Sequence, residues 1–217
     1  IENDMNYSAY LFDFDYTLAD SSTGIVKCFR IVLERHGFLS VSEEAIRRTI
    51  GKTLEESFAI LTGEHDAQTL KEWRSEYTTE ANRYMNVNTR LYPDTLDTLR
   101  RLKADGARIG IISTKYRYRI LDFFSDKVEP DFIDLVVGGE DVTHAKPHPE
   151  GLLAAMDRLG VTPSQVLYVG DSTVDALTAQ AAGTDFAGVL TGATTRQELE
   201  AYPHTRLMNS LAELVEP

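Results

Sequence analysis

Five short apolar segments, each ending at an acidic, hydroxyl or glycine residue, constrain this 217-residue chain more than any other feature. They are Ala9–Phe12 and residues 109–112, 132–137, 166–169 and 186–190. Each has the length and apolar character of a buried strand. Helical patterns lie between some of them, at residues 93–106, 150–159 and 176–182. A short helical pattern at residues 211–215 follows the last segment. Strands that alternate with helices imply parallel βαβ units, so we expect an α/β fold with a Rossmann-like, doubly wound parallel sheet.

One block interrupts this alternation. Residues 24 to 85 have helical periodicity and contain no strand-like segment. Ser42 and Thr53 have the sequence context of helix starts, and Gly37 that of a helix end. Trp73 and the tyrosines near it are expected to pack inside this block. We therefore predict an inserted all-helical cap over one edge of the sheet, with the core at residues 1–18 and 89–217 and the cap at 19–88.

The net charge of −12 limits the choice of partners. A chain this acidic has no long-range attraction for nucleic acid or for an anionic membrane. It also repels anionic substrates at a distance, so a phosphate site needs local cations or a metal. No apolar run approaches the roughly 20 residues of a membrane span. We therefore expect neither nucleic acid nor membrane as a partner, and a monomer or weak homodimer.

The sequence also bears on the compartment. Cys28 is the chain's single cysteine, so an intrachain disulfide is impossible, which fits a reducing compartment. Cys28 lies in an apolar run, where packing is its expected role. Ile1–Asp4 lacks the basic and apolar regions of a signal peptide. We expect a cytoplasmic protein.

Polar segments follow the predicted strands where such sheets bind ligands. In a parallel α/β sheet, ligands bind at the carboxyl ends of the strands, near the switch in strand order. Four segments are placed there: residues 13–17, 113–115, 146–147 and 170–175. Their joint placement indicates one shared site at this edge.

Taken singly, these segments have plainer interpretations. Asp13 and Asp15 are compatible with turn or helix-cap residues, and Asp171 with a helix N-cap. Lys146 alone is typical of a solvated surface charge. However, a carboxylate directly after a buried strand is costly without a partner, which favours a functional role for Asp13.

Four motifs identify a family resemblance. They are Phe-Asp-Phe-Asp-Tyr-Thr-Leu-Ala-Asp-Ser at 12–21, Ile-Ile-Ser-Thr-Lys at 111–115, His-Ala-Lys-Pro-His-Pro-Glu at 144–150 and Gly-Asp-Ser-Thr-Val-Asp at 170–175. From about Tyr10 to Leu190 the chain resembles the haloacid dehalogenase-like superfamily, in its phosphoglycolate-phosphatase-like branch with a helical cap. Two departures are Ser113-Thr114, where relatives often have Thr-Asn, and Asp94 after Pro93, where they often have glycine.

The resemblance implies roles for four catalytic residues. Asp13 would be the nucleophile that forms an aspartyl-phosphate, and Asp15 would be the general acid and base. Carboxylates two residues apart on extended backbone point to opposite faces, so the chain must turn sharply after Asp13. Ser113 would donate a hydrogen bond to the phosphate, and Lys146 would neutralise the phosphate and Asp13 together.

The resemblance also implies a Mg²⁺ cofactor. Asp13 and Asp171 would be side-chain ligands, and the backbone carbonyl of Asp15 would face the metal. Asp175 would act from a second layer or through water.

Further residues are predicted to bind the substrate. Thr17, Thr114 and Lys115 are expected to assist at the sheet edge. In the cap, Arg48 and Lys52, on either side of Gly51, stand where the family often has specificity residues, although arginines there also suit a solvated helix face. His144 and His148 are expected to be structural or rim residues.

These features predict a Mg²⁺-dependent phosphatase acting on a small phosphorylated metabolite, a monoester such as phosphoglycolate or a sugar phosphate. Two alternatives remain open: an inorganic pyrophosphatase and a β-phosphoglucomutase-like isomerase. Mutases of this superfamily usually have glycine after the second aspartate, where this chain has Tyr16. A catalytically idle binding protein is disfavoured because all four motifs are intact.

Overall fold

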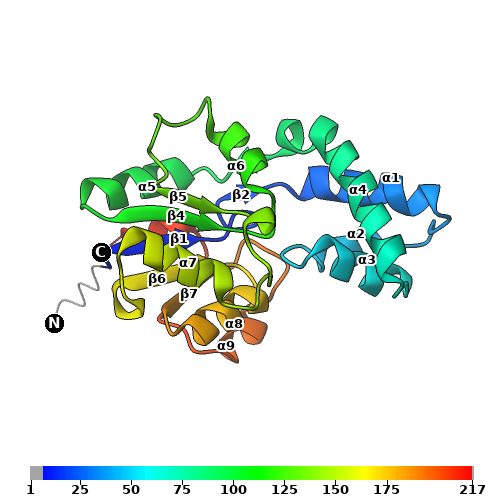
Figure 1. Cartoon of the computed structure of the whole chain (residues 1–217). Coiled ribbons are helices and arrows are strands. Elements are labelled where there is room, and N and C mark those ends of the chain that lie inside the picture. The colour runs from blue at the N-terminus through cyan, green and yellow to red at the C-terminus, as the bar shows by residue number, and fades with distance from the viewer. Residues whose placement is uncertain (1–6, 217) are drawn as a thin grey trace.

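The computed structural model describes residues 7–216, so the expectation about Ile1–Asp4 lies outside the described residues. Its centre is a six-stranded sheet in the order β5-β4-β1-β6-β7-β8 (Figure 1). The strands are β1 (Ala9–Phe12), β4 (Arg108–Ile112), β5 (Leu135–Val137), β6 (Val166–Gly170), β7 (Asp185–Val189) and β8 (Arg206–Met208). Every neighbouring pair is parallel. The strand order reverses at β1, between β4 and β6, which confirms the doubly wound prediction.

Helices cover both faces of the sheet. They are α5 (Thr95–Ala104), α6 (Arg117–Phe124), α7 (Glu150–Leu159), α8 (Thr173–Ala182) and α9 (Arg196–Glu200). Short 3₁₀ turns lie at Asn86–Asn88, Gly139–Asp141, Pro163–Gln165 and Leu211–Leu214. In β1, Tyr10 and Phe12 join the core under α5 and α6, whereas Ala9 and Leu11 join the core under α7 and α8. The alternation of β1 side chains thus supplies both cores, because successive residues of a strand point to opposite faces.

Four helices form a separate body beside one end of the sheet (Figure 1). They are α1 (Ser22–Arg35), α2 (Glu43–Arg47), α3 (Leu54–Thr62) and α4 (Ala67–Tyr84). This helical body has its own core, in which the Phe58 ring lies 5.6 Å from Trp73 and 6.4 Å from Tyr77. Cys28 is fully buried in the same core. Trp73 and Cys28 therefore have the packing roles expected for them.

Local capping explains where these helices begin. The side chains of Ser42 and Thr53 accept hydrogen bonds from the N–H groups of Ala45 and Glu56, as N-caps do. The chain enters and leaves the helical body through β2 (Ala19–Asp20) and β3 (Arg90–Leu91), which pair antiparallel. The two segments that connect the helical body to the sheet body therefore lie side by side. The predicted domain boundaries at residues 18/19 and 88/89 stay a prediction.

The structure differs from the predicted elements in several places. The predicted strand at 132–137 is a strand only from Leu135, because the chain turns at Asp131, which has a φ of 63°. Phe132 and Ile133 still pack against the sheet core. The sequence reasoning missed α6, α9, β2, β3 and β8, each of which spans eight residues or fewer. Among residues 7–216, no helix combines the length and apolar character needed to cross a bilayer.

Candidate active site

Three strand ends bring the predicted site residues together. Asp13 follows β1, Ser113 follows β4 and Asp171 follows β6, and all three are buried. The N–H of Asp13 donates to Val169 O at 2.9 Å, and the N–H of Ser113 to Val137 O at 3.0 Å. These bonds extend the sheet by one residue, so backbone pairing sets where the two side chains begin.

The chain turns sharply after Asp13, as predicted. The N–H groups of Thr17–Ala19 donate to the carbonyl oxygen of Phe14 at 3.0–3.3 Å. Tyr16 has a φ of 62°, in the left-handed region that is uncommon for residues other than glycine. The Thr191 hydroxyl donates to the Tyr16 carbonyl and ties down this loop.

Lys146 lies at the centre of the site. Its Nζ is 3.0 Å from Asp13 Oδ1 and 2.7 Å from Asp175 Oδ1, and it donates to Tyr168 OH at 3.2 Å. The lysine is only 7% exposed. Burial alone lowers the pKa of Lys146, but the charges of Asp13 and Asp175 outweigh it and raise this pKa well above its ordinary value. The lysine is therefore charged, as the predicted role requires.

Three carboxylates meet beside this lysine. One oxygen from each of Asp13, Asp171 and Asp175 lies within 4.8 Å of the others, and all three residues are buried. Burial raises the pKa of Asp13 to about 7, although Lys146 opposes the shift. Burial, with repulsion from Asp175 and Asp13, also raises the pKa of Asp171. One lysine does not neutralise three buried carboxylates, so the cluster lacks positive charge.

A hard divalent cation fits this cluster. Asp13 Oδ2 is buried and has no hydrogen-bond partner, and an orphaned buried acceptor is costly. Carboxylate oxygens are the ligands that Mg²⁺ prefers. The cluster thus has the donors, the charge and one unsatisfied oxygen for such an ion.

The carboxylates differ in how they are held. Ser172 N and Oγ donate to Asp175 Oδ2 at 3.1 and 2.7 Å in a capping box that opens α8. The Thr17 hydroxyl donates to Asp171 Oδ1 at 3.2 Å, so Thr17 contacts a cluster residue. Gly170 leaves room for this arrangement, because a Cβ there would collide with the Asp175 carboxyl group.

Asp15 faces a different set of partners. The Ser21 hydroxyl donates to Asp15 Oδ1, and Lys115 Nζ lies 3.1 Å from the same oxygen. The Lys115 N–H donates to Ser113 Oγ at 3.1 Å. The structure therefore brings Lys115, predicted to bind substrate, into contact with the predicted acid and base.

A cavity of about 80 Å³ lies between the helical body and this edge of the sheet. Its polar lining includes Asp15, Thr114 and Lys115 from the sheet side and Lys52 from the helical body. The apolar lining comes from the helical body: Ile25, Phe29, Ile50, Leu54, Tyr77, Ala81 and Met85. Lys52 Nζ lies 3.7 Å from Glu56, one helical turn away. The cavity can hold a small, partly apolar group next to Asp15.

The structure does not bring Arg48 into this cavity. Its guanidinium makes two bonds to the Glu198 carboxylate, at 2.6 and 3.3 Å, and one to the Ala193 carbonyl. Arg48 instead lines a second hollow of about 170 Å³ that also contacts Asp171 and Ser172. Through these contacts, Arg48 joins the helical body to the sheet body.

Sequence reasoning missed several contributors. Tyr168 OH donates to Asp175 Oδ1 at 3.2 Å and accepts from Lys146. Tyr168 has the one polar side-chain group in the apolar strand β6, and this feature of the sequence could have marked it as a contributor. Ser21, which contacts Asp15, closes the first motif but was given no role, whereas the buried Arg119, which lines the cavity, gave no such signal.

Comparison with known proteins agrees with this geometry. Residues 10–189 match the family model of haloacid dehalogenase-like hydrolases. A phosphoglycolate phosphatase of Yersinia pseudotuberculosis is 30% identical over 83% of this chain and 80% of its own length. The pyrophosphatase PpaX of Bacillus cereus is 29% identical over 97% of this chain and 96% of its own.

A solved structure gives the same result. The crystal structure of a haloacid dehalogenase-like hydrolase from Bacteroides fragilis is 62% identical, with a TM-score of 0.95 over 96% of this chain and 99% of that one. The family match spans most of the chain, and the matched region contains all four motifs. The chain therefore belongs to the haloacid dehalogenase-like hydrolases, among their phosphoglycolate-phosphatase-like members.

Proposed function

We propose that this hydrolase, a phosphatase of its family, uses Asp13 to take the phosphoryl group from a small phosphate monoester, with Mg²⁺ as its cofactor. One observation carries the proposal. Lys146 fixes Asp13 Oδ1, whereas Asp13 Oδ2 is buried and has no partner. A buried carboxylate that a lysine orients suits nucleophilic attack on phosphorus, and its uncommitted oxygen suits the cation.

The chain's own residues supply the proton and charge transfers. Asp13 attacks phosphorus, and the bond from phosphorus to the leaving oxygen breaks while Asp15 protonates that oxygen. Asp15 then takes a proton from water, which attacks the aspartyl-phosphate and releases phosphate with Asp13 restored. Lys146 and the Ser113 hydroxyl offset charge on the phosphoryl oxygens.

The carboxylate cluster would hold the cation. Asp13 and Asp171 would be its side-chain ligands, with the backbone carbonyl of Asp15, and Asp175 would orient them through Lys146 and Ser172. When bound, Mg²⁺ supplies positive charge for the phosphate and for the ionised Asp13.

Two substrate classes fit the cavity. Its small volume and apolar wall favour a compact leaving group, such as that of phosphoglycolate or a small sugar phosphate. Lys52 and Lys115 also line it, which favours a leaving group that carries its own negative charge. Inorganic pyrophosphate meets the conditions of small size and negative charge, although not that of the apolar wall, and it is the second candidate, supported by the likeness to PpaX.

The deciding experiment measures phosphate release from phosphoglycolate, sugar phosphates, nucleotides and pyrophosphate, with Mg²⁺ and with chelator. Asp13→Asn tests the nucleophile, and Asp126→Asn, at an exposed acid paired with Lys127, is the matched control. We expect release to require Mg²⁺, to fall at least about 10³-fold in Asp13→Asn and to persist in the control. Release that survives in Asp13→Asn would refute the assigned nucleophile.

We further propose that the enzyme acts in the cytoplasm, as a monomer or weak homodimer, on free metabolites rather than on nucleic acid or membranes. The acidic charge and the buried single cysteine support this placement. Cell fractionation and light scattering at two concentrations test it. A membrane-bound pool, or a dimer that persists on dilution, would count against it.

A further inference from the structure

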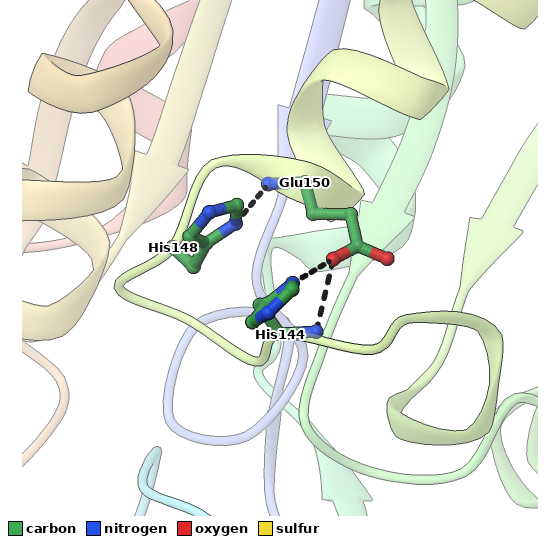
Figure 2. Close-up of side chains that lie close together, drawn as sticks. All are labelled: His144, His148 and Glu150. Atoms are coloured by element: carbon green, nitrogen blue, oxygen red, sulfur yellow. Dashed lines mark hydrogen bonds and ion pairs between the residues drawn. The ribbon is translucent and has the colours of Figure 1, made fainter.

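A cluster of metal-ligand side chains lies on the surface, apart from the carboxylate cluster. His144, His148 and Glu150 come from the loop that presents Lys146 and from the first turn of α7 (Figure 2). Both histidines are exposed and the glutamate is partly exposed. One ligand atom from each lies within 4.8 Å of the others. Only this group and the Asp13 group have such an arrangement among residues 7–216.

Local contacts hold the three side chains together. The His144 and His148 rings face one another, with centroids 4.7 Å apart and planes inclined by 34°. His144 Nδ1 lies 2.8 Å from Glu150 Oε2, and the Glu150 N–H donates to His148 Nδ1 at 3.2 Å (Figure 2). The N–H groups of Thr143 and His144 also donate to the Glu150 carboxylate, at 2.8 and 2.9 Å. The carboxylate is therefore fixed on the loop that carries both rings.

We propose that His144, His148 and Glu150 form a binding site for a late first-row transition metal ion of the Zn²⁺, Ni²⁺ and Cu²⁺ class. Two imidazoles and a carboxylate are donors that these ions prefer, whereas Mg²⁺ prefers oxygen alone. Water completes the coordination. No step of the proposed phosphatase reaction uses this site.

The geometry requires only side-chain motion. Metal–nitrogen bonds of about 2.0–2.1 Å need the ligand atoms to close in from their present spread of up to 4.8 Å. The His144 side chain is 62% exposed, so it has room to rotate, while the backbone contacts keep Glu150 in place. His144 and His148 stand two residues before and after Lys146, so a bound ion would join the two sides of its loop.

Cu²⁺ bound to the full-length chain tests the site. One equivalent is added in the presence of excess Mg²⁺, which occupies the oxygen-only carboxylate cluster, and the nitrogen couplings are measured by electron paramagnetic resonance. We expect couplings from two imidazoles. They should disappear in the double variant His144→Asn, His148→Asn, whose amides retain some hydrogen-bonding capacity. Zn²⁺ titrated by calorimetry should bind that variant about tenfold more weakly, or worse.

The remaining histidines supply the matched control. The triple variant His36→Asn, His65→Asn, His204→Asn should keep the two-imidazole signal and the Zn²⁺ affinity. An unchanged spectrum and affinity in the double variant would overturn the proposal, as would loss of the signal in the triple variant.

Circular dichroism checks folding, and if the double variant unfolds, each single variant should show one imidazole coupling fewer. Glu150→Gln should weaken Zn²⁺ binding while both couplings remain, and unaltered affinity would remove Glu150 from the ligand set.

Discussion

Asp13 carries opposing demands. In the proposed reaction it needs burial to exclude water and charge to attack phosphorus, and burial raises its pKa from 3.8 to about 7. Lys146 meets part of this cost, and a divalent cation fits the remainder. Without a cation, the proposed nucleophile would destabilise the fold when it ionises.

A pH dependence of stability follows for metal-free protein. A carboxyl group whose pKa is raised on folding binds its proton more tightly in the folded state, so ionisation favours unfolding as pH rises from about 4 through about 7. In chelator, Asp13→Asn should therefore lose less stability than the wild type across this window. Urea denaturation at several pH values measures the difference. Equal pH slopes for the two proteins would show that Asp13 does not titrate there.

Tyr168 offers a second prediction at this scale. Its hydroxyl contacts Lys146, Asp175 and the Ile112 carbonyl inside the core. Tyr168→Phe removes this link but keeps the ring, so it should lower the free energy of unfolding by about 1–2 kcal/mol. Tyr202→Phe, near the surface, serves as the comparison in urea denaturation. A Tyr168→Phe protein as stable as the wild type would mean that the hydroxyl contributes nothing net.

Among the elements, one exposed ion pair links the end of α2, in the helical body, to α9, in the sheet body. Arg48 follows α2, and Glu198 lies in α9. The sequence predicted Arg48 to bind substrate, whereas the structure pairs it with Glu198 across this boundary. The pair is exposed, so its energetic effect is small.

A double-mutant cycle separates the two roles of Arg48. If the ion pair only links the two bodies, Arg48→Ala and Glu198→Ala should each change kcat/KM by less than about fivefold, and the double variant should match the single variants. If Arg48 binds substrate, Arg48→Ala should raise KM while Glu198→Ala does not. The cycle is measured with the best substrate of the panel and with free Mg²⁺ held constant.

The whole molecule adds an electrostatic property that no single element has. Its net charge of −12 repels anions at long range, while in the proposed function Lys52, Lys115 and Lys146 attract phosphate locally. Salt screens the long-range repulsion between exposed charges far more than contacts inside a buried site.

Moderate salt should therefore speed the capture of substrate. We expect kcat/KM to rise as the ionic strength increases from about 10 to about 150 mM, because the Debye length falls from about 30 to about 8 Å. Steady-state rates at constant free Mg²⁺ measure this, with glycerol added to check for viscosity effects. A steady decrease of kcat/KM with increasing salt would show that the positive charges of the site dominate the approach of the substrate.

The sequence alone determined the fold class, the family and the carboxyl-edge position of Asp13, Ser113 and Asp171. These are local consequences: a short apolar strand ends at a polar residue, and parallel strands place their carboxyl ends at one edge. The capping residues Ser42 and Thr53 were predictable for the same reason, because the atoms that they bond lie three residues away. The turn after Asp13 was predicted from the spacing of two carboxylates together with the roles that the family resemblance implies for them.

Only the tertiary structure decided the partners of these residues. Thr17 meets Asp171 across 154 positions, and Arg48 meets Glu198 across 150. Lys146 joins Asp13 and Asp175 because β1, β6 and the loop before α7 converge. The short strand β8 forms because β7 pairs with it, and its own three residues carry little pattern. Helix α9 has a local start signal, because Thr195 and Glu198 form a capping box. Contacts between distant positions depend on how the helices pack against the sheet, and the periodicity of the sequence does not predict that packing.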